Sequence, residues 1–160
     1  MSFIGQFQAK IDSKNRVFLP AAFRRGIQPE LSQDGHSEDV TVVVRRDFFE
    51  NCLVVYPVAQ WQYEINKVRS RLNRFDSAQQ MVYRKLVSEA QEVVLDSSGR
   101  MLIPRQMLEK VGIGHDVLFV GMEQTIELWA PSVAGARSGG EEPFMSDESF
   151  AEGIKEFMIE

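Results

Sequence analysis

Apolar and polar residues alternate at the start of the chain. Phe3, Gly5, Phe7, Ala9 and Ile11 occupy alternate positions, and glutamine and lysine side chains stand between the later ones. A period of two over this length is typical of a strand with one buried face. The pattern therefore predicts a strand over residues 3–11. The apolar run at 17–19 is expected to return beside it as its partner strand.

The same patterns predict the other short elements. Helices are expected at 20–25 and 104–111, because each stretch begins with proline and is followed by glycine. The polar stretch 28–39 is rich in turn-forming residues and predicts a surface loop. Further strands are predicted at 40–44, 53–56, 93–95, 101–103, 117–120 and 125–129.

Longer helices are predicted in the middle and at the end of the chain. Apolar residues three and four positions apart indicate an amphipathic helix over 58–75. Ser77 and Gln80 have the spacing of a capping box, which predicts a second helix to about residue 88. The stretch 131–140 is rich in glycine, serine and alanine, which predicts a linker. A last amphipathic helix is expected from Ser149 onward.

One ten-residue pattern occurs twice, beginning at Ile11 and again at Leu95. Each copy reads apolar, Asp, three small or polar residues, Arg, three apolar residues, Pro. Two copies are too few for a solenoid, so the repeat predicts two equivalent halves that share one core. The fold class expected is α+β, mainly β, with helices between the halves. The halves are expected to close one β-barrel, since closure removes exposed strand edges.

Each copy carries the chemistry of a tight turn. The side chains of Asp12 and Asp96 can accept hydrogen bonds from backbone amides two or three residues further on. Asn15 and Gly99 occupy the same place in the two copies, and both residue types tolerate a left-handed backbone. These four residues are therefore expected to brace two similar turns.

An arginine follows each aspartate by four positions, as Arg16 and Arg100. An ion pair across so tight a turn would fix the loop and aim the guanidinium outward. One such turn could be a β-turn closed by an ion pair, with no function. Two turns in the same register, each presenting an arginine, favour a binding site.

The paired Asp-x-x-x-Arg units, the Leu-Pro and Ile-Pro that follow them, and the stretches 53–57 and 126–129 together resemble the MraZ family. That family comprises bacterial transcriptional regulators built from two AbrB-type domains. The resemblance covers residues 3–129. It implies a swapped-hairpin barrel, a homo-oligomeric ring, and binding of double-stranded DNA at direct repeats. The regulator would act as a repressor upstream of the division and cell-wall gene cluster.

The resemblance also implies how the chain is divided. Residues 3–57 would form the first AbrB-type repeat, 58–88 a helical connector, 89–131 the second repeat, and 132–160 a flexible acidic tail. The first turn is expected to carry most DNA contacts, because Ser98 stands where the first turn has a lysine. The residues expected to bind DNA are Lys10, Lys14, Arg16, Arg24 and Arg100.

The charge distribution agrees with a nucleic-acid ligand although the whole chain has a net charge of −5. Residues 132–160 contain seven acidic and two basic side chains, and so account for the whole net charge of −5. Residues 1–28 contain five basic side chains and one acidic side chain. Positive charge is thus concentrated around the first turn, where a DNA-binding site needs it.

Two other function classes are weighed against this one. An enzyme is disfavoured, because the sequence has no phosphate loop, nucleophile elbow or cysteine pair. No cofactor, metal or small-molecule substrate is therefore expected. A protein-interaction or scaffold module is the alternative, but it does not require the basic turn that phosphate neutralisation requires. The single Cys52 and the absence of a run of ~20 apolar residues predict a cytoplasmic protein without a membrane span. As a DNA-binding regulator it would be nucleoid-associated.

Overall fold

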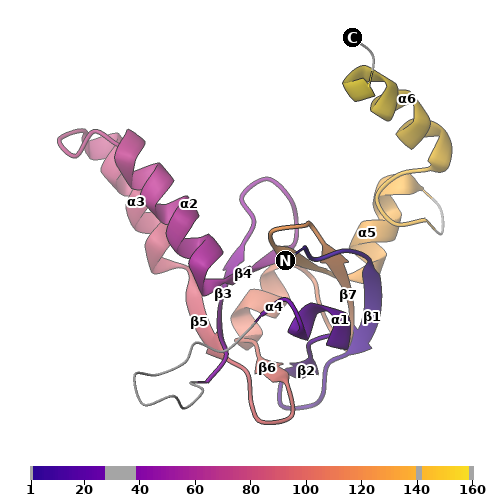
Figure 1. Cartoon of the computed structure of the whole chain (residues 1–160). Helices are drawn as coiled ribbons and strands as arrows, with labels where there is room; N and C mark the ends of the chain where they lie inside the picture. Colours follow the sequence, from indigo (N-terminus) through magenta and orange to yellow (C-terminus); the bar gives the residue numbers. More distant parts are fainter. Residues whose placement is uncertain (1, 28–38, 140–141, 159–160) are drawn as a thin grey trace.

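The computed structural model describes residues 2–27, 39–139 and 142–158 (Figure 1). The predicted loop at 28–39 lies outside the described residues except for its last residue. The strands are β1 (Gln6–Lys10), β2 (Arg16–Phe18), β3 (Thr41–Arg46), β4 (Leu53–Pro57), β5 (Gln91–Val94), β6 (Arg100–Leu102), β7 (Asp116–Gly121) and β8 (Ile126–Trp129). The helices are α1 (Ala21–Arg24), α2 (Val58–Arg71), α3 (Ser77–Ser88), α4 (Arg105–Lys110), α5 (Pro131–Ser138) and α6 (Asp147–Met158).

The two halves of the chain exchange strands. A six-stranded antiparallel sheet has the order β1-β7-β8-β4-β3-β5, and β2 pairs with β6 in a separate two-stranded sheet. The first strand of each half pairs with the third strand of the other half, as β1 with β7 and β5 with β3. The last strands of the halves pair with each other, as β4 with β8. Within each half the last two strands pair with each other, as β3 with β4 and β7 with β8, but the first two strands find their partners in the other half.

The prediction that residues 17–19 pair with the first strand is wrong. β2 pairs with β6, with Val17 opposite Met101, and β1 pairs with β7. The reason lies in the turn between β1 and β2. Its left-handed residue, Asn15, directs its carbonyl to the Ile103 amide of the other half, and the Leu19 amide donates to the Gly99 carbonyl in return. The chain thus leaves the turn toward the other half of the molecule.

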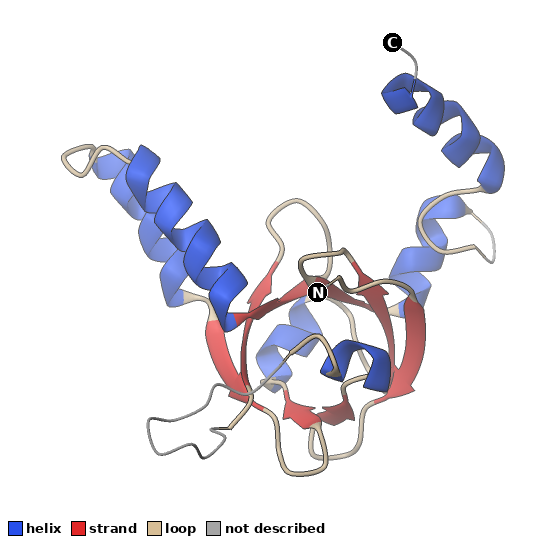
Figure 2. Ribbon diagram, viewed as in Figure 1, coloured by secondary structure: helices blue, strands red, loops and turns tan. Residues whose placement is uncertain are grey.

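The expected closed barrel is also not found. β1 and β5 are the edges of the six-stranded sheet, and neither forms a hydrogen-bonded ladder with β2 or β6 within the described residues. The sheet curls around α1 and α4, and the β2–β6 pair lies across its open side (Figure 2). β2 and β6 contain only three residues each, and their hydrogen bonds are used in pairing with each other.

One hydrophobic core joins the two halves. Val17 and Met101 point into it from the middle of β2 and β6, and both are fully buried or nearly so. Phe23 of α1 is completely buried and makes edge-to-face contacts with Phe3 and Phe7, at centroid distances of 5.8 and 5.1 Å. Truncation of a buried phenylalanine to alanine costs about 3–5 kcal/mol, so these contacts fix α1 against β1.

Two helical arms extend from this core on opposite sides (Figure 1). One arm is the antiparallel pair α2–α3. Its first helix ends four residues earlier than predicted, and the N-cap of α3 is Asp76 instead of Ser77. The Asp76 carboxylate accepts from the Gln79 amide at 3.1 Å, so the acidic residue one position earlier takes the capping role.

The other arm is formed by α5 and α6, and it corrects the predicted linker at 131–140. Pro131 begins α5 at a position where a missing amide hydrogen is harmless, and Gly139 ends it with a left-handed φ of 71°. Ala134 is completely buried in a cluster with Trp129, which anchors α5 to the sheet. The small residues that suggested a linker therefore allow close helix packing. Among the described helices, none is long and apolar enough to cross a membrane.

Candidate functional site

The first repeated turn is organised by a single carboxylate. Oδ1 of Asp12 accepts from the backbone amides of Lys14 and Arg16, each at 2.9 Å. Oδ2 accepts from Nε of the Arg16 side chain, also at 2.9 Å. The amide of Asp12 donates to the Arg16 carbonyl and closes the loop, while Asn15 adopts a left-handed φ of 64°. One side chain thus fixes both the backbone of the turn and the direction of its arginine.

The second turn repeats this geometry. Oδ1 of Asp96 accepts from the amides of Ser98 and Arg100 at 2.9 Å, and Oδ2 accepts from Arg100 Nε at 2.8 Å. Gly99 has a φ of 84° at the place where the first turn has asparagine. The repeat in the sequence is therefore a repeat of hydrogen bonds.

Both aspartates are held in the ionised form. The backbone amide of Arg16 is the largest cause that lowers the pKa of Asp12 below its ordinary value of 3.8. The backbone amide of Arg100 does the same for the pKa of Asp96. In both turns the arginine side chain adds to this effect. An ionised carboxylate accepts hydrogen bonds and donates none, so these groups suit bracing instead of proton transfer.

The aspartates engage only one nitrogen of each guanidinium. Arg16 and Arg100 donate through Nε, and within the described residues their terminal nitrogens, Nη1 and Nη2, make no hydrogen bond. The Arg100 guanidinium also lies over the Phe18 ring, 5.6 Å from its centroid. Each arginine is therefore oriented by the protein while its terminal donors stay available to an external acceptor.

The pairing of β2 with β6 places the two arginines on one surface. Arg16 lies opposite Leu102, and Phe18 lies opposite Arg100. These four residues alternate with the buried Val17 and Met101, so they share the outward side, which we call the ribbon face. Phe18 is 54% exposed and Leu102 is 57% exposed. The two apolar members of the ribbon face were not found by sequence reasoning, although their alternation with buried neighbours could have indicated them.

The other predicted residues have different surroundings. Lys14 is exposed at the tip of the first turn. Lys10 is exposed on β1, where it forms an ion pair with Asp116 at 3.2 Å. Arg24 reaches across to the second turn, where its Nη1 lies 3.4 Å from the Ser98 carbonyl oxygen. A Cβ added to Gly99 would lie 2.7 Å from the same nitrogen, so a larger residue at this position would displace the Arg24 side chain.

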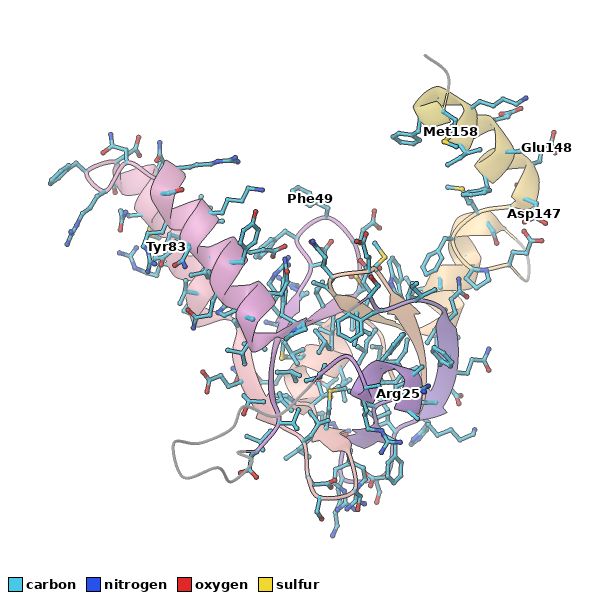
Figure 3. All side chains as sticks on the ribbon, viewed as in Figure 1. Arg25, Phe49, Tyr83, Asp147, Glu148 and Met158 are labelled. Atoms are coloured by element: carbon cyan, nitrogen blue, oxygen red, sulfur yellow. The ribbon has the colours of Figure 1, made fainter. Side chains whose placement is uncertain are left out.

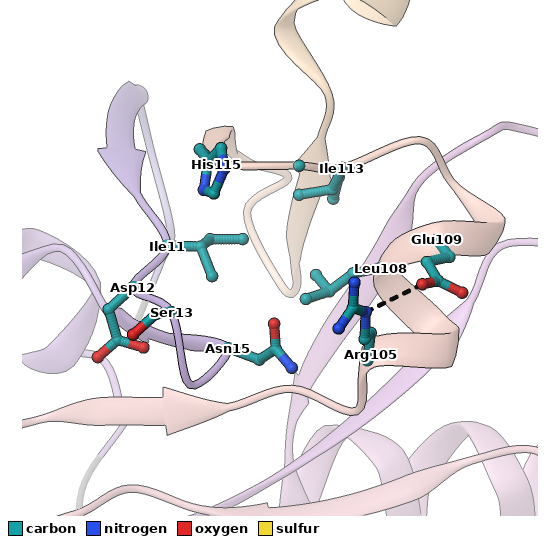
Figure 4. Close-up of a pocket in the computed structure, with 10 residues that line it drawn as sticks. Ile11, Asp12, Ser13, Asn15, Arg105, Leu108, Glu109, Ile113 and His115 are labelled. Atoms are coloured by element: carbon teal, nitrogen blue, oxygen red, sulfur yellow. Dashed lines mark hydrogen bonds and ion pairs between the residues drawn. The ribbon is translucent and has the colours of Figure 1, made fainter.

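Whereas the second turn contacts Arg24, the first turn borders an open pocket of about 300 Å³ that lies between the turn and α4 (Figure 4). Asp12 and Asn15 line it on one side, and His115 lies at the β7 end. Arg105 and Glu109 form an ion pair across the α4 wall at 3.0 Å. Among the described residues, at this pocket or outside it, no three His, Cys, Asp or Glu side chains are grouped so that they could hold a metal ion.

The bracing role of the aspartates leads to a prediction about stability and pH. In Asp96→Asn the ion pair to Arg100 is lost while a side-chain oxygen can still accept from the amides. The midpoint of thermal unfolding at pH 7 is expected to fall by a few degrees, and further in Asp96→Ala. Because the folded-state pKa of Asp96 is lowered, its contribution is present above the unfolded value near 3.8 and is lost as pH falls through the folded pKa.

The difference in unfolding midpoint between the wild type and Asp96→Asn is therefore expected to shrink on acidification below about pH 4, as followed by circular dichroism. Asp12→Asn serves as the matched variant, because it loses the same bonds in the other turn. If both variants unfold like the wild type at pH 7, the aspartates do not brace the turns.

Comparisons with known proteins agree with the geometry of the repeat. The family model described as MraZ protein matches the chain twice, over residues 2–85 and 86–132. A transcriptional regulator MraZ from Phocaeicola vulgatus is 39% identical, over 99% of this chain and 94% of its own length. Its relative from Bacteroides thetaiotaomicron is 38% identical, over 98% of this chain and 92% of its own length.

The relative from Coxiella burnetii, also a transcriptional regulator MraZ, is 35% identical over 81% of this chain and 80% of its own length. The Phocaeicola alignment, which leaves out only 1% of this chain, includes the C-terminal helices. Two matched repeats, high coverage and the paired turns lead to one conclusion. The chain belongs to the MraZ family of transcriptional regulators, which are not enzymes.

Proposed function

We propose that the chain binds double-stranded DNA in a sequence-specific manner through the ribbon face and the two turns beside it. The observation that carries this proposal is the pair of aspartate-oriented arginines, Arg16 and Arg100, on the two strands of one small sheet. The terminal nitrogens of both guanidinium groups lack protein partners in the described residues. Phosphate oxygens and the acceptors of guanine are the ligands that such paired donors fit.

The rigid placement of these donors supports specific binding. The Leu19 amide donates to the Gly99 carbonyl and the Ile103 amide to the Asn15 carbonyl, each at 3.1 Å, so the turns are tied to each other. Donors that are already positioned lose little conformational freedom when DNA binds. Lys14 adds a mobile positive charge at the first tip, where it can neutralise a phosphate and release a counterion. The exposed Phe18 and Leu102 offer apolar contact to sugars or thymine methyl groups.

We further propose that several subunits bind together, as a homo-oligomeric ring. One chain offers two arginines and a few lysines, which are too few contacts for specific binding at physiological salt. Subunits that repeat around a ring present the same face in nearly the same orientation, so they fit direct repeats in DNA. The proposed operator lies upstream of the division and cell-wall gene cluster, where the protein acts as a repressor in the nucleoid of the cytoplasm.

In this proposal the parts of the chain have separate roles. Residues 3–57 and 89–131 contribute one turn each to the DNA-binding surface, and 58–88 connect them. Lys10 and Arg24 support binding less directly, because each already interacts with another part of the protein. A protein-interaction module is the second candidate, and the exposed apolar side chains of the two helical arms favour it.

The proposal predicts that Arg16→Ala weakens operator binding by about 1–3 kcal/mol, measured by fluorescence anisotropy at fixed salt. Arg100→Ala is the matched control, since it loses an equivalent intramolecular bond. Both variants are expected to unfold at similar temperatures. Arg16→Ala is expected to weaken binding more, because the first turn also carries Lys14. Unchanged binding in both variants would exclude the turns as the DNA site.

The ring proposal predicts a dependence on the spacing of DNA repeats. Direct repeats one helical turn of ~10 base pairs apart meet neighbouring subunits on the same side of the DNA. Insertion of about half a turn between two repeats is expected to abolish tight binding and to leave the weak binding of a single repeat. The measurement is a titration of duplexes that differ only in this insertion. Equal affinity for both duplexes, or a footprint over an inverted repeat, would contradict the arrangement.

A further inference from the structure

The two repeated turns have the same internal hydrogen bonds but different neighbours. Helix α1 follows Pro20, and helix α4 follows Pro104. The residue four positions after the proline is Arg24 in the first half and Leu108 in the second half. The side chain of Arg24 reaches the second turn, whereas Leu108 is buried in the core. One turn therefore has a long charged side chain beside it at a place where the other has none.

Arg24 packs closely against the second turn. Its Nη1 lies 3.4 Å from the Ser98 carbonyl oxygen. A Cβ placed on Gly99 would lie 2.7 Å from Nη1 and 2.8 Å from Cδ, so both the stem and the guanidinium of Arg24 lie against Gly99. The Leu19 amide also donates to the Gly99 carbonyl, at 3.1 Å. Gly99 is therefore contacted both by the chain just before α1 and by a side chain of α1.

The helix that carries Arg24 is itself firmly anchored. Phe23, the residue before Arg24, is completely buried and makes edge-to-face contacts with Phe3 and Phe7. The backbone from which Arg24 extends is thus fixed to the core. Arg24 can therefore limit the movement of the second turn relative to the core.

The first turn lies beside open space at the corresponding place. Its left-handed residue, Asn15, lines the pocket of about 300 Å³ between the turn and α4 (Figure 4). Arg105 of α4 lines the same pocket, where its Nε donates to the Glu109 carboxylate at 3.0 Å. The first turn therefore has room to move toward α4, whereas the Arg24 side chain fills the space between the second turn and α1.

We propose that Arg24 is a positioning residue that fixes the second turn, so that the second turn is the rigid element of the DNA-binding surface and the first turn the adaptable one. This role rests on the proposed function and adds a division of tasks between the turns. Arg100, in the fixed turn, loses little conformational freedom on binding and discriminates between base sequences. Arg16 and Lys14 adjust to the DNA backbone and supply affinity. Arg24 contributes to specificity through the second turn, without contact to DNA.

Hydrogen–deuterium exchange of the free protein tests the positioning role without DNA. In Arg24→Ala, the amides of residues 98–100 are expected to lose protection by about threefold or more, because their turn gains freedom. The amides of residues 14–16 are expected to keep theirs. Arg25→Ala is the matched control, because the exposed Arg25 carries the same charge and lies at the C-terminal end of α1 (Figure 3). It is expected to leave both turns unchanged.

A second variant removes the same contact from the side of the turn. Gly99→Asn gives the second turn the residue type of the first, which tolerates a left-handed backbone. Its Cβ displaces the Arg24 side chain. Gly99→Asn is therefore expected to lose protection as Arg24→Ala does. The double variant is expected to match the single variants, because both changes remove one shared contact.

The consequence for DNA binding is measured by fluorescence anisotropy over a range of salt concentrations. Arg24→Ala is expected to lower the affinity for a duplex with direct repeats by about threefold to tenfold, and to leave the affinity for a duplex without repeats unchanged. The slope of log affinity against log salt concentration is expected to match that of Arg25→Ala. Added to Arg100→Ala, Arg24→Ala is expected to cause no further loss, whereas its effect adds to that of Arg16→Ala.

Unchanged protection of residues 98–100 in Arg24→Ala would overturn the positioning role. A salt slope reduced by about one in Arg24→Ala alone, or a loss that adds fully to that of Arg100→Ala, would overturn it as well, because either result identifies a direct phosphate contact. If the wild-type chain binds duplexes with and without repeats equally, the proposed function fails, whereas exchange in the free protein still decides the role of Arg24.

Discussion

The pairing of β2 with β6 is the constraint on which the rest of the structure depends. Three residues from each half form this pair, and Val17 lies opposite Met101 at its centre. The pair is held at both ends by amides that donate to the carbonyls of the left-handed residues, Asn15 and Gly99. Each turn is braced by its own aspartate and is also bonded to the other half, so the two turns are held in a fixed relation to each other. The large sheet also joins the two halves, because β1 pairs with β7 and β5 pairs with β3.

This constraint also explains why the candidate site combines rigidity with accessible charge. Each aspartate uses one oxygen for the backbone of its turn and the other for the Nε of an arginine. The orientation of the guanidinium is therefore set before any ligand arrives, and its terminal nitrogens remain available. A net charge of −5 for the chain does not oppose the proposed DNA binding, because residues 132–160 account for all of it and extend away from the turns (Figure 1).

Much of this structure could be predicted from local sequence patterns. The repeat at Ile11 and Leu95, the turn chemistry of Asp12 and Asp96, and most strands and helices follow from residue type and spacing. The strand pairing could not be predicted, because β2 is equally suited to β1 and β6 and only tertiary hydrogen bonds decide between them. The contact of Arg24 with the second turn is equally non-local. The 131–140 stretch was mistaken for a linker, because composition does not reveal that Ala134 packs beneath Trp129.

Hydrogen–deuterium exchange of the full chain, with and without a duplex that carries the proposed direct repeats, tests the central claim most directly. The α2–α3 arm has a net charge of +4 and is the competing basic surface in the described chain. Our account predicts that DNA slows amide exchange at residues 12–18 and 96–102, and that a duplex without repeats does so much less. Protection confined to residues 58–88, with unchanged exchange in both turns, would contradict it.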